Sequence, residues 1–209
     1  MSSKEMSGAI LAGGMSRRLG QDKASLLVAG KPLARWVAEA LAPWVTECWL
    51  LTNQPQAHLS LGLPLITDLR PFQGPLGGLE TALFHARTPL VLAAAVDAPF
   101  LAPPLLAALT ARAAKGVRTA VVCHSSRGLQ PFPGVYAVRL LARLTAFLHD
   151  NGRQVRRFLE ECRPQALAQE EVARLDPEGR SFLNLNTPED LSRAAARLGL
   201  QDTALSPSS

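Results

Sequence analysis

Residues 8–24 read GAILAGGMSRRLGQDKA, an apolar run that breaks into two glycines, two arginines, a third glycine and an aspartate-lysine pair. The apolar run has the composition of a buried strand, whereas the glycines leave the following segment conformationally free. Cations, together with backbone N–H groups that glycine leaves accessible, suit a phosphate group. This stretch therefore predicts a strand followed by an anion-binding loop.

Strand-like apolar runs alternate with helical patterns along most of the chain. For example, PLVLAAAVD at residues 89–97 precedes PPLLAALTARAAK at residues 103–115. Nearly continuous apolar runs are typical of strands buried on both faces, and their alternation with helices is typical of a covered parallel sheet. We therefore predict an α/β fold with a single Rossmann-like, mostly parallel twisted sheet and helices on both faces. Residues 1–200 are expected to form one domain, and residues 201–209 a disordered tail.

Composition narrows the class of ligand. The 209 residues are 47% hydrophobic and 19% charged, as in ordinary globular proteins, and the net charge is +5. The arginines are spread along the chain with acids between them, and a single tyrosine is available for stacking on bases. We interpret the basic excess as favouring anionic ligands of some kind, with nucleic acid the less favoured of them.

The chain also lacks the signatures of export and of membrane insertion. Its three cysteines lie far apart, which predicts reduced thiols instead of a disulfide framework or a zinc site. The longest apolar stretch, residues 90–109, contains Asp97 and prolines, so it is not expected to span a membrane. The first apolar run is too short for a secretion signal, and we expect a cytoplasmic protein.

The loop after the first strand does not match the familiar phosphate loops. Gly20 is followed by Gln-Asp-Lys where a Walker A loop has Lys-Ser/Thr, and no G-x-G-x-x-G fingerprint occurs. Instead, LAGGMSRRLGQDKA at residues 11–24 resembles the signature of the molybdenum cofactor guanylyltransferases, a branch of the nucleotidyltransferases with a Rossmann-like sheet. The similarity continues, in the same order, in TD and GPLGGLETAL (residues 67–83), DAPFL (97–101), QPFPGVY (130–136) and FLNLNTPEDL (182–191).

The resemblance implies roles that the residue types can fill. Asp97 follows a buried strand, and a hard carboxylate there suits Mg²⁺, which binds through one or two carboxylates plus substrate phosphates. In the family the position of Asp97 is the metal ligand. Lys23 and Arg17 supply cations for the phosphates, so Lys23, Arg17 and Asp97 are the expected catalytic residues. Asp68 matches a nucleotide-binding aspartate and is a candidate second Mg²⁺ ligand. An aspartate that caps the next helix is the structural alternative for Asp97.

The resemblance also implies a GTP pocket and an acceptor pocket. The residues expected around GTP are Leu11, Ala12, Gly13, Gly14, Lys23, Asn53, Asp68, Gly78 and Asp97. Asn184 and Asn186 lie two apart in a strand-like segment, so their amides should share one face, and they are expected on the molybdopterin side. Asn53 could instead be a strand-end turn residue, and the glycines at 74–78 an ordinary turn. Many relatives are more aliphatic at residues 132–134, which leaves that side of the acceptor pocket undefined.

The implied reaction transfers GMP from GTP to the phosphate of molybdenum-bearing molybdopterin, with Mg²⁺ as cofactor and pyrophosphate as the leaving group. The product is the guanine dinucleotide cofactor. Because the acceptor phosphate is already ionised, the reaction needs no general base. Transient partners are expected among molybdenum-insertion proteins and recipient molybdoenzymes, but not nucleic acid or membranes. The alternatives are a related transferase that uses CTP or a sugar phosphate, a non-catalytic nucleotide or cofactor carrier and, third, a nucleic-acid-binding module.

Two local patterns complete the analysis. NTPEDL at residues 186–191 predicts a helix that Thr187 caps and that begins at Pro188, with two acids at its positive end. The four histidines show no metal-ligand spacing and are expected at the surface or at helix ends.

Overall fold

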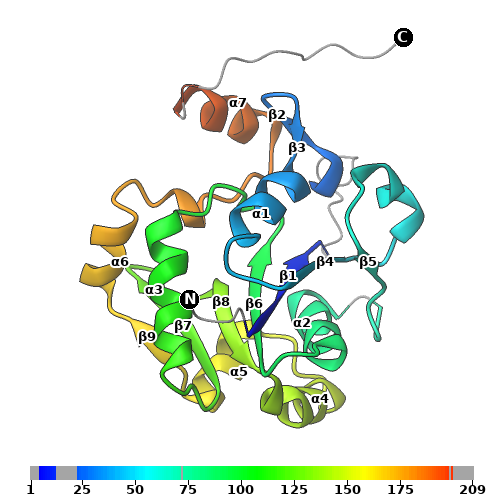
Figure 1. The fold of residues 1–209 in the computed structure, drawn as a ribbon, viewed down its shortest axis with the longest axis vertical. Coiled ribbons are helices and arrows are strands. Elements are labelled where there is room, and N and C mark those ends of the chain that lie inside the picture. Colours follow the sequence, from blue (N-terminus) through cyan, green and yellow to red (C-terminus); the bar gives the residue numbers. More distant parts are fainter. Residues whose placement is uncertain (1–4, 13–22, 72, 198, 200–209) are drawn as a thin grey trace.

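The computed structural model describes residues 5–12, 23–71, 73–197 and 199 (Figure 1). Its main sheet has the strand order β5-β4-β1-β6-β8-β7-β9, and β2 and β3 form a separate hairpin. The strands are β1 (Met6–Leu11), β2 (Leu27–Val28), β3 (Lys31–Pro32), β4 (Glu47–Leu51), β5 (Leu65–Ile66), β6 (Leu90–Ala95), β7 (Ala120–Ser125), β8 (Gly128–Ala137) and β9 (Gln165–Leu167).

Helices follow most of these strands. The α-helices are α1 (Leu33–Leu41), α2 (Pro75–His85), α3 (Pro103–Ala114), α4 (Leu141–His149), α5 (Val155–Cys162), α6 (Gln169–Leu175) and α7 (Pro188–Arg197). Short 3₁₀ turns are η1 (Lys23–Ser25), η2 (Pro55–Leu61), η3 (Val138–Leu140) and η4 (Arg180–Phe182). Within the described residues, no helix is long and apolar enough to cross a bilayer.

The main sheet is parallel except for β8. Strands β5, β4, β1 and β6 pair in parallel, as do β7 and β9, whereas β8 runs antiparallel to both β6 and β7. A two-residue connection between Ser125 and Gly128 forces this reversal, because so short a link can join only antiparallel strands. The predicted mostly parallel sheet is therefore confirmed.

Both faces of the sheet are buried under helices, as predicted. Successive residues of β1 alternate between two cores: Ile10 packs on one face, and Ala9 and Leu11 on the other. Helices α1, α3, α6 and α7 bury side chains in the first core, whereas α2, α4 and α5 bury theirs in the second (Figure 1). The long apolar runs in the sequence are explained by this two-sided burial.

The carboxyl ends of four parallel strands form one edge. The chain passes from β1 to β4 and β5 on one side, then crosses to β6 on the other side of β1. Ligands of open α/β sheets bind at such a switch point. Hydrogen bonds continue beyond the strand ends, from the Ala12 N–H to the Leu51 carbonyl (3.0 Å) and from the Val96 N–H to the Leu11 carbonyl (3.1 Å). The backbone that follows each strand is thereby fixed at this edge.

The C-terminal third differs from the sequence prediction in its local detail. FLNLN is not a strand: Phe182 ends the turn η4, and residues 183–186 have no place in either sheet. Their burial still alternates, so both asparagines lie on the exposed side. Helix α7 does begin at Pro188, as predicted.

His58 corrects the expectation that the histidines lie at the surface or at helix ends, because it is only 1% exposed within η2.

Candidate active site at the carboxyl edge of the sheet

A small cleft lies at the switch point between β1 and β6. Its walls come from the ends of both strands, from the start of α2, from η1 and from β8, namely Leu11, Ala12, Lys23, Pro75, Ala95, Val96, Asp97 and Phe132. Lys23 and Asp97 are the only charged residues among them. The cleft therefore presents one cation and one carboxylate against apolar walls, at the address where α/β sheets bind ligands.

Lys23 and Asp97 form an ion pair inside this cleft. The Lys23 Nζ lies 2.9 Å from Asp97 Oδ2, and the two side chains are 19% and 25% exposed. The same ammonium also donates to Asn186 Oδ1 at 2.5 Å. Three predicted site residues, one of them from the acceptor group, are thus brought together although 163 positions separate Lys23 from Asn186.

The position of Asp97 follows from β6 and from the segment before α7. Asp97 lies two residues beyond the end of β6, and its carbonyl accepts a hydrogen bond from the Leu185 N–H at 2.7 Å. The alternative that Asp97 caps the next helix is wrong, because Ala102 is the N-cap of α3 and receives no side-chain cap. The carboxylate is therefore directed at the cleft and its lysine instead of at a helix end.

A second polar pair lies beyond β4 and β5. The Asn53 Nδ2 donates to Asp68 Oδ2 at 3.0 Å, and Asp68 is only 6% exposed. Burial raises the pKa of the Asp68 carboxyl group, and the hydrogen bond from Asn53 partly opposes that rise. The turn after β4 is closed by Thr52, whose hydroxyl accepts the Gln54 N–H, so Asn53 is not needed as the turn residue.

Two buried acceptors of this pair have no partner among the described residues. They are Asn53 Oδ1 and Asp68 Oδ1. An unpaired buried acceptor costs free energy, on the order of 1–3 kcal/mol, and this cost is removed when a donor arrives. The pair is consequently suited to a ligand that presents N–H or O–H groups.

The loop that carries Asp68 is anchored on α2. The Leu69 N–H donates to the Thr81 hydroxyl at 2.9 Å, and Arg70 approaches the buried Glu80 carboxylate at 3.2 Å. Glu80 also accepts a hydrogen bond from the Thr145 hydroxyl of α4 at 2.7 Å. The sequence did not indicate this anchor, because Glu80 lies within the apolar pattern of a buried helix.

The glycines before and within α2 have different uses. Gly74 precedes the helix with φ 65° and ψ −156°, a conformation that side chains disfavour. Gly78 is buried against the sheet, where an added Cβ would lie 3.1 Å from Leu11 and 3.7 Å from Asp68 Oδ1. Gly78 thus allows α2 to pack closely behind Asp68, and direct contact of Gly78 with a nucleotide stays a prediction.

Some predicted site residues lie outside the described part of the chain, and others lie at the margin of the cleft. Gly13, Gly14 and Arg17 lie outside the described residues, as does the tail 201–209. Asn184 is exposed next to the cleft segment. Phe132, which no site prediction included, lines the cleft because antiparallel β8 begins at this edge. The QPFPGVY segment that carries Phe132 was the one available signal.

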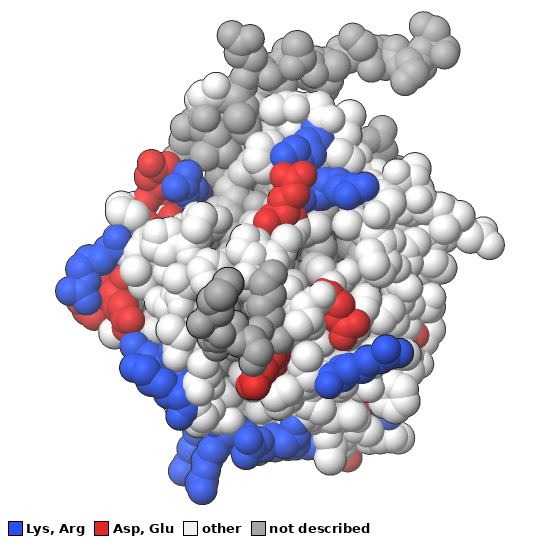
Figure 2. Space-filling model, viewed as in Figure 1, with Lys and Arg blue, Asp and Glu red and all other residues white. Residues whose placement is uncertain are grey.

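Charged side chains of both signs are interspersed over the face shown in Figure 2. Among the described residues, several charged side chains are paired, such as Lys31 with Glu39 at 2.6 Å and Arg112 with Glu171 at 3.0 Å. The interleaving of acids and bases in the sequence is thus carried into the surface of this face.

Sequence comparisons identify relatives over nearly the whole chain. A model for the MobA-like NTP transferase domain matches residues 8–170, more than half of the chain. The molybdenum cofactor guanylyltransferase of Cereibacter sphaeroides is 38% identical over 201 residues, which cover 91% of this chain and 96% of that protein. The probable molybdenum cofactor guanylyltransferase of Deinococcus radiodurans is 35% identical over 192 residues, which cover 92% and 95%.

Solved structures agree with these relatives. Molybdopterin-guanine dinucleotide biosynthesis protein A from Archaeoglobus fulgidus has a TM-score of 0.79 at 27% identity and covers 93% of this chain and 100% of its own. CMP:2-keto-3-deoxy-manno-octonic acid synthetase, solved with CTP, has a TM-score of 0.69 and covers 93% and 98%, but at 15% identity it shows the fold alone. The chain therefore belongs to the MobA-like NTP transferase family, among the molybdenum cofactor guanylyltransferases.

Proposed function

We propose that this nucleotidyltransferase of molybdenum cofactor biosynthesis moves GMP from GTP onto the phosphate of molybdenum-bearing molybdopterin. The observation that carries the proposal is the pairing of Lys23 with Asp97 in the cleft between β1 and β6. A phosphate oxygen of the acceptor attacks the α-phosphorus of GTP. The bond from that phosphorus to the β-phosphate oxygen then breaks, so pyrophosphate leaves and a guanine dinucleotide remains.

Lys23 contributes charge and not a proton transfer. The attacking phosphate is already ionised, so the reaction consists of positioning and charge stabilisation. The Lys23 ammonium donates hydrogen bonds to Asp97 and Asn186 in the structure, and we propose that it also donates to the triphosphate oxygens when GTP binds. Arg17, which lies outside the described residues, is proposed to hold phosphate oxygens as a bidentate fork, and Gly13 and Gly14 are proposed to offer backbone N–H groups to the same phosphates.

The residues present fit a magnesium ion that the substrate helps to hold. No group of three or more His, Cys, Asp or Glu side chains forms a metal site within the described part of the chain. Asp97 alone suits Mg²⁺, which needs few protein carboxylates when phosphates complete its shell. We assign the ion to Asp97 and not to Asp68, because Asp97 lines the cleft beside Lys23, whereas Asp68 is paired with Asn53 and is not among the residues that line the cleft. When bound, the ion would neutralise charge on the phosphate oxygens.

The Asn53 and Asp68 pair supports guanine as the base. Both residues have a buried oxygen without a donor among the described residues. The edge of guanine carries two neighbouring donors, an N–H and an amino group, whereas cytosine has one amino donor beside an acceptor. Two acceptors on hydrogen-bonded side chains therefore match guanine better. Leu11, Ala12 and Gly78 complete the proposed nucleotide side from β1 and α2.

The acceptor side is proposed to lie along the segment before α7. Asn184 and Asn186 lie on its exposed side, next to Asp97. Phe132 adds an aromatic wall to the cleft, suited to a flat ring system. The three free cysteines fit a reducing compartment, so we place the reaction in the cytoplasm, with transient contacts to molybdenum-insertion proteins and recipient molybdoenzymes.

Calorimetric titration of GTP, CTP, ATP and UTP with Mg²⁺ tests the nucleotide assignment. Selective binding of GTP is expected, followed by pyrophosphate release when molybdopterin is added. A preference for CTP would keep the reaction type but overturn the base assignment. GTP binding without pyrophosphate release would favour the non-catalytic carrier.

A further inference from the structure

We propose that Asp190, at the start of α7, is a positioning residue for Lys23. Its carboxylate holds the turn that presents the Asn186 amide, and that amide holds the Lys23 ammonium in the cleft. The inference rests on the proposed function, because Lys23 has its catalytic task only in that reaction. It assigns a role to Asp190, which lies outside the cleft.

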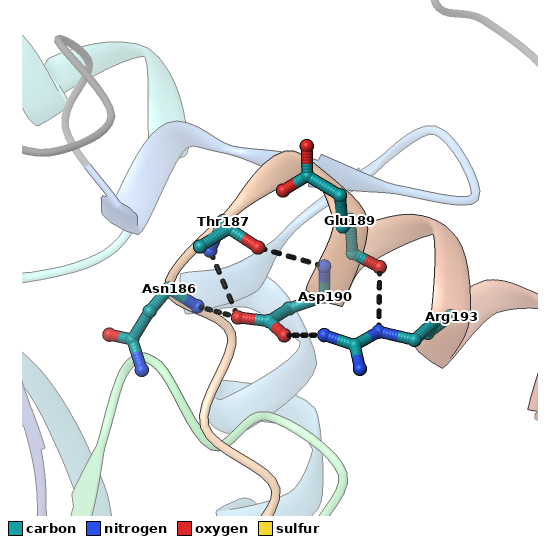
Figure 3. Close-up of polar contacts among 5 residues, drawn as sticks. All are labelled: Asn186, Thr187, Glu189, Asp190 and Arg193. Carbon is teal, nitrogen blue, oxygen red and sulfur yellow. Dashed lines mark hydrogen bonds and ion pairs between the residues drawn. The ribbon is translucent and has the colours of Figure 1, made fainter.

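The first link is a capping box with an additional bond (Figure 3). The Thr187 hydroxyl accepts the Asp190 N–H at 3.2 Å, and Asp190 Oδ2 accepts the Thr187 N–H at 3.0 Å. These two bonds satisfy the helix start. Asp190 Oδ2 also accepts the Asn186 N–H at 3.0 Å, which helix capping does not require. This third bond lowers the pKa of Asp190 more than any other group does, so the carboxylate is ionised at neutral pH.

The second link fixes Asn186 from both sides. On one side, the Leu185 N–H donates to the Asp97 carbonyl at 2.7 Å. On the other, Asp190 holds the N–H groups of Asn186 and Thr187. Asn186 Oδ1 is thereby directed at Lys23 Nζ, 2.5 Å away. The Asp190 carboxylate contacts the Asn186 and Thr187 backbone through Oδ2 and Arg193 through Oδ1 (Figure 3).

The third link explains why the lysine needs support. Lys23 is a flexible side chain at the beginning of η1, and its ammonium loses much rotamer freedom when it is held in one place. The Asn186 oxygen and the Asp97 carboxylate meet this requirement before substrate arrives. Helix α7, which follows Asn186, also packs against β2, which follows η1 and Lys23 (Figure 1). The segments that carry Lys23 and Asn186 are therefore held near each other by backbone packing as well.

Asp190→Ala is therefore expected to lower kcat/KM for GTP by about tenfold, the size typical of losing a supporting contact. Asp190→Asn keeps an acceptor oxygen for the two N–H groups and should restore most of the activity. Thr187→Ala is the matched control, since it weakens the same helix start but leaves the bond from Asn186 to Asp190. The double variant Asn186→Ala, Asp190→Ala should be no slower than Asn186→Ala alone, because both changes act through one contact.

A readout independent of turnover is the rate at which an acetylating succinimidyl ester labels Lys23, measured by peptide mass spectrometry. Asp190→Ala should raise this rate several-fold, whereas Thr187→Ala and Asp190→Asn should leave it near the wild-type value. Unchanged labelling in Asp190→Ala, or an equal rise in Thr187→Ala, would overturn the inference whatever the activity. A wild-type protein that holds Lys23 in this way but releases no pyrophosphate from GTP would overturn the proposed function instead.

Discussion

The two polar groups at the edge of the sheet are built in opposite ways. Asp68 is buried, Asn53 is partly buried, and each has a buried acceptor oxygen without a donor among the described residues. Lys23, Asp97 and Asn186 instead satisfy one another. The first group thus suits a ligand with donor groups, whereas under the proposed function the second group exchanges its internal contacts for phosphate and metal. The proposed function thereby assigns base selection and chemistry to different strands.

Among the variants, Asp97→Ala should cause the largest loss of activity, because it removes the carboxylate of the group formed by Lys23, Asp97 and Asn186. Asp97 is the only carboxylate among the described residues that line the cleft. We expect Mg²⁺-dependent pyrophosphate release to fall by at least about a thousandfold. Thermal unfolding should change little, because the bond from Leu185 is to the Asp97 backbone. Glu39→Ala is a control at an exposed ion pair, and activity retained in Asp97→Ala would place the metal elsewhere.

Lys23→Ala should have the next largest effect. Loss of the ammonium leaves developing phosphate charge less stabilised, so turnover should fall about a hundredfold and GTP should bind more weakly. Single-turnover kinetics with calorimetric binding separate the two effects. Lys31→Ala removes a lysine from the nearby hairpin and should leave both quantities unchanged. A wild-type rate in Lys23→Ala would move the triphosphate away from this cleft.

Asp68→Asn should weaken GTP binding but raise the stability of the fold, which distinguishes Asp68 from Lys23 and Asp97. GTP binding is expected to weaken about tenfold, since one acceptor of the pair becomes neutral or turns to a donor. The free energy of unfolding should rise at neutral pH, because burial raises the pKa of Asp68 and so disfavours the carboxylate.

The pH dependence of Asp68→Asn has a definite sign. The folded protein binds the Asp68 proton more tightly than the unfolded chain does, so wild-type stability falls as pH rises through the window between the two pKa values. The stability gain of Asp68→Asn should consequently be largest at neutral pH and vanish below about pH 4, the ordinary pKa of Asp. Chemical unfolding at several pH values measures it, and a variant that is less stable at pH 7 would contradict the assignment.

Thr187→Ala should have the smallest effect on activity. Loss of the cap should lower the free energy of unfolding by about 1 kcal/mol, while kcat stays within about twofold of wild type. Denaturant melts and steady-state assays report the two quantities separately. A loss of activity as large as that of Asp190→Ala would mean that helix stability, and not the hold on Asn186, supports the site.

Much of the fold follows from local patterns, because a strand covered on both faces is apolar throughout. Asp97 and Lys23 could be placed at one edge on that basis, since parallel strands bring their carboxyl ends together. Three features needed the tertiary structure. The direction of β8 depends on a two-residue turn. FLNLN alternates like a strand, yet residues 183–186 join neither sheet, and the Leu185 N–H bonds to the Asp97 carbonyl beyond the end of β6. The contact between Lys23 and Asn186 joins distant segments that no spacing connects.

The late position of Asn186 in the chain has a consequence for biosynthesis. A ribosome adds roughly 5–20 residues per second, and 163 positions separate Lys23 from Asn186. On the order of ten to thirty seconds therefore pass between translation of the lysine and translation of the amide that holds it. During that interval the nascent chain can form the sheet edge around Asn53 and Asp68, but of the two groups that hold Lys23 only Asp97 has been translated. The proposed two-sided hold on Lys23 can thus form only after Asn186 has been translated.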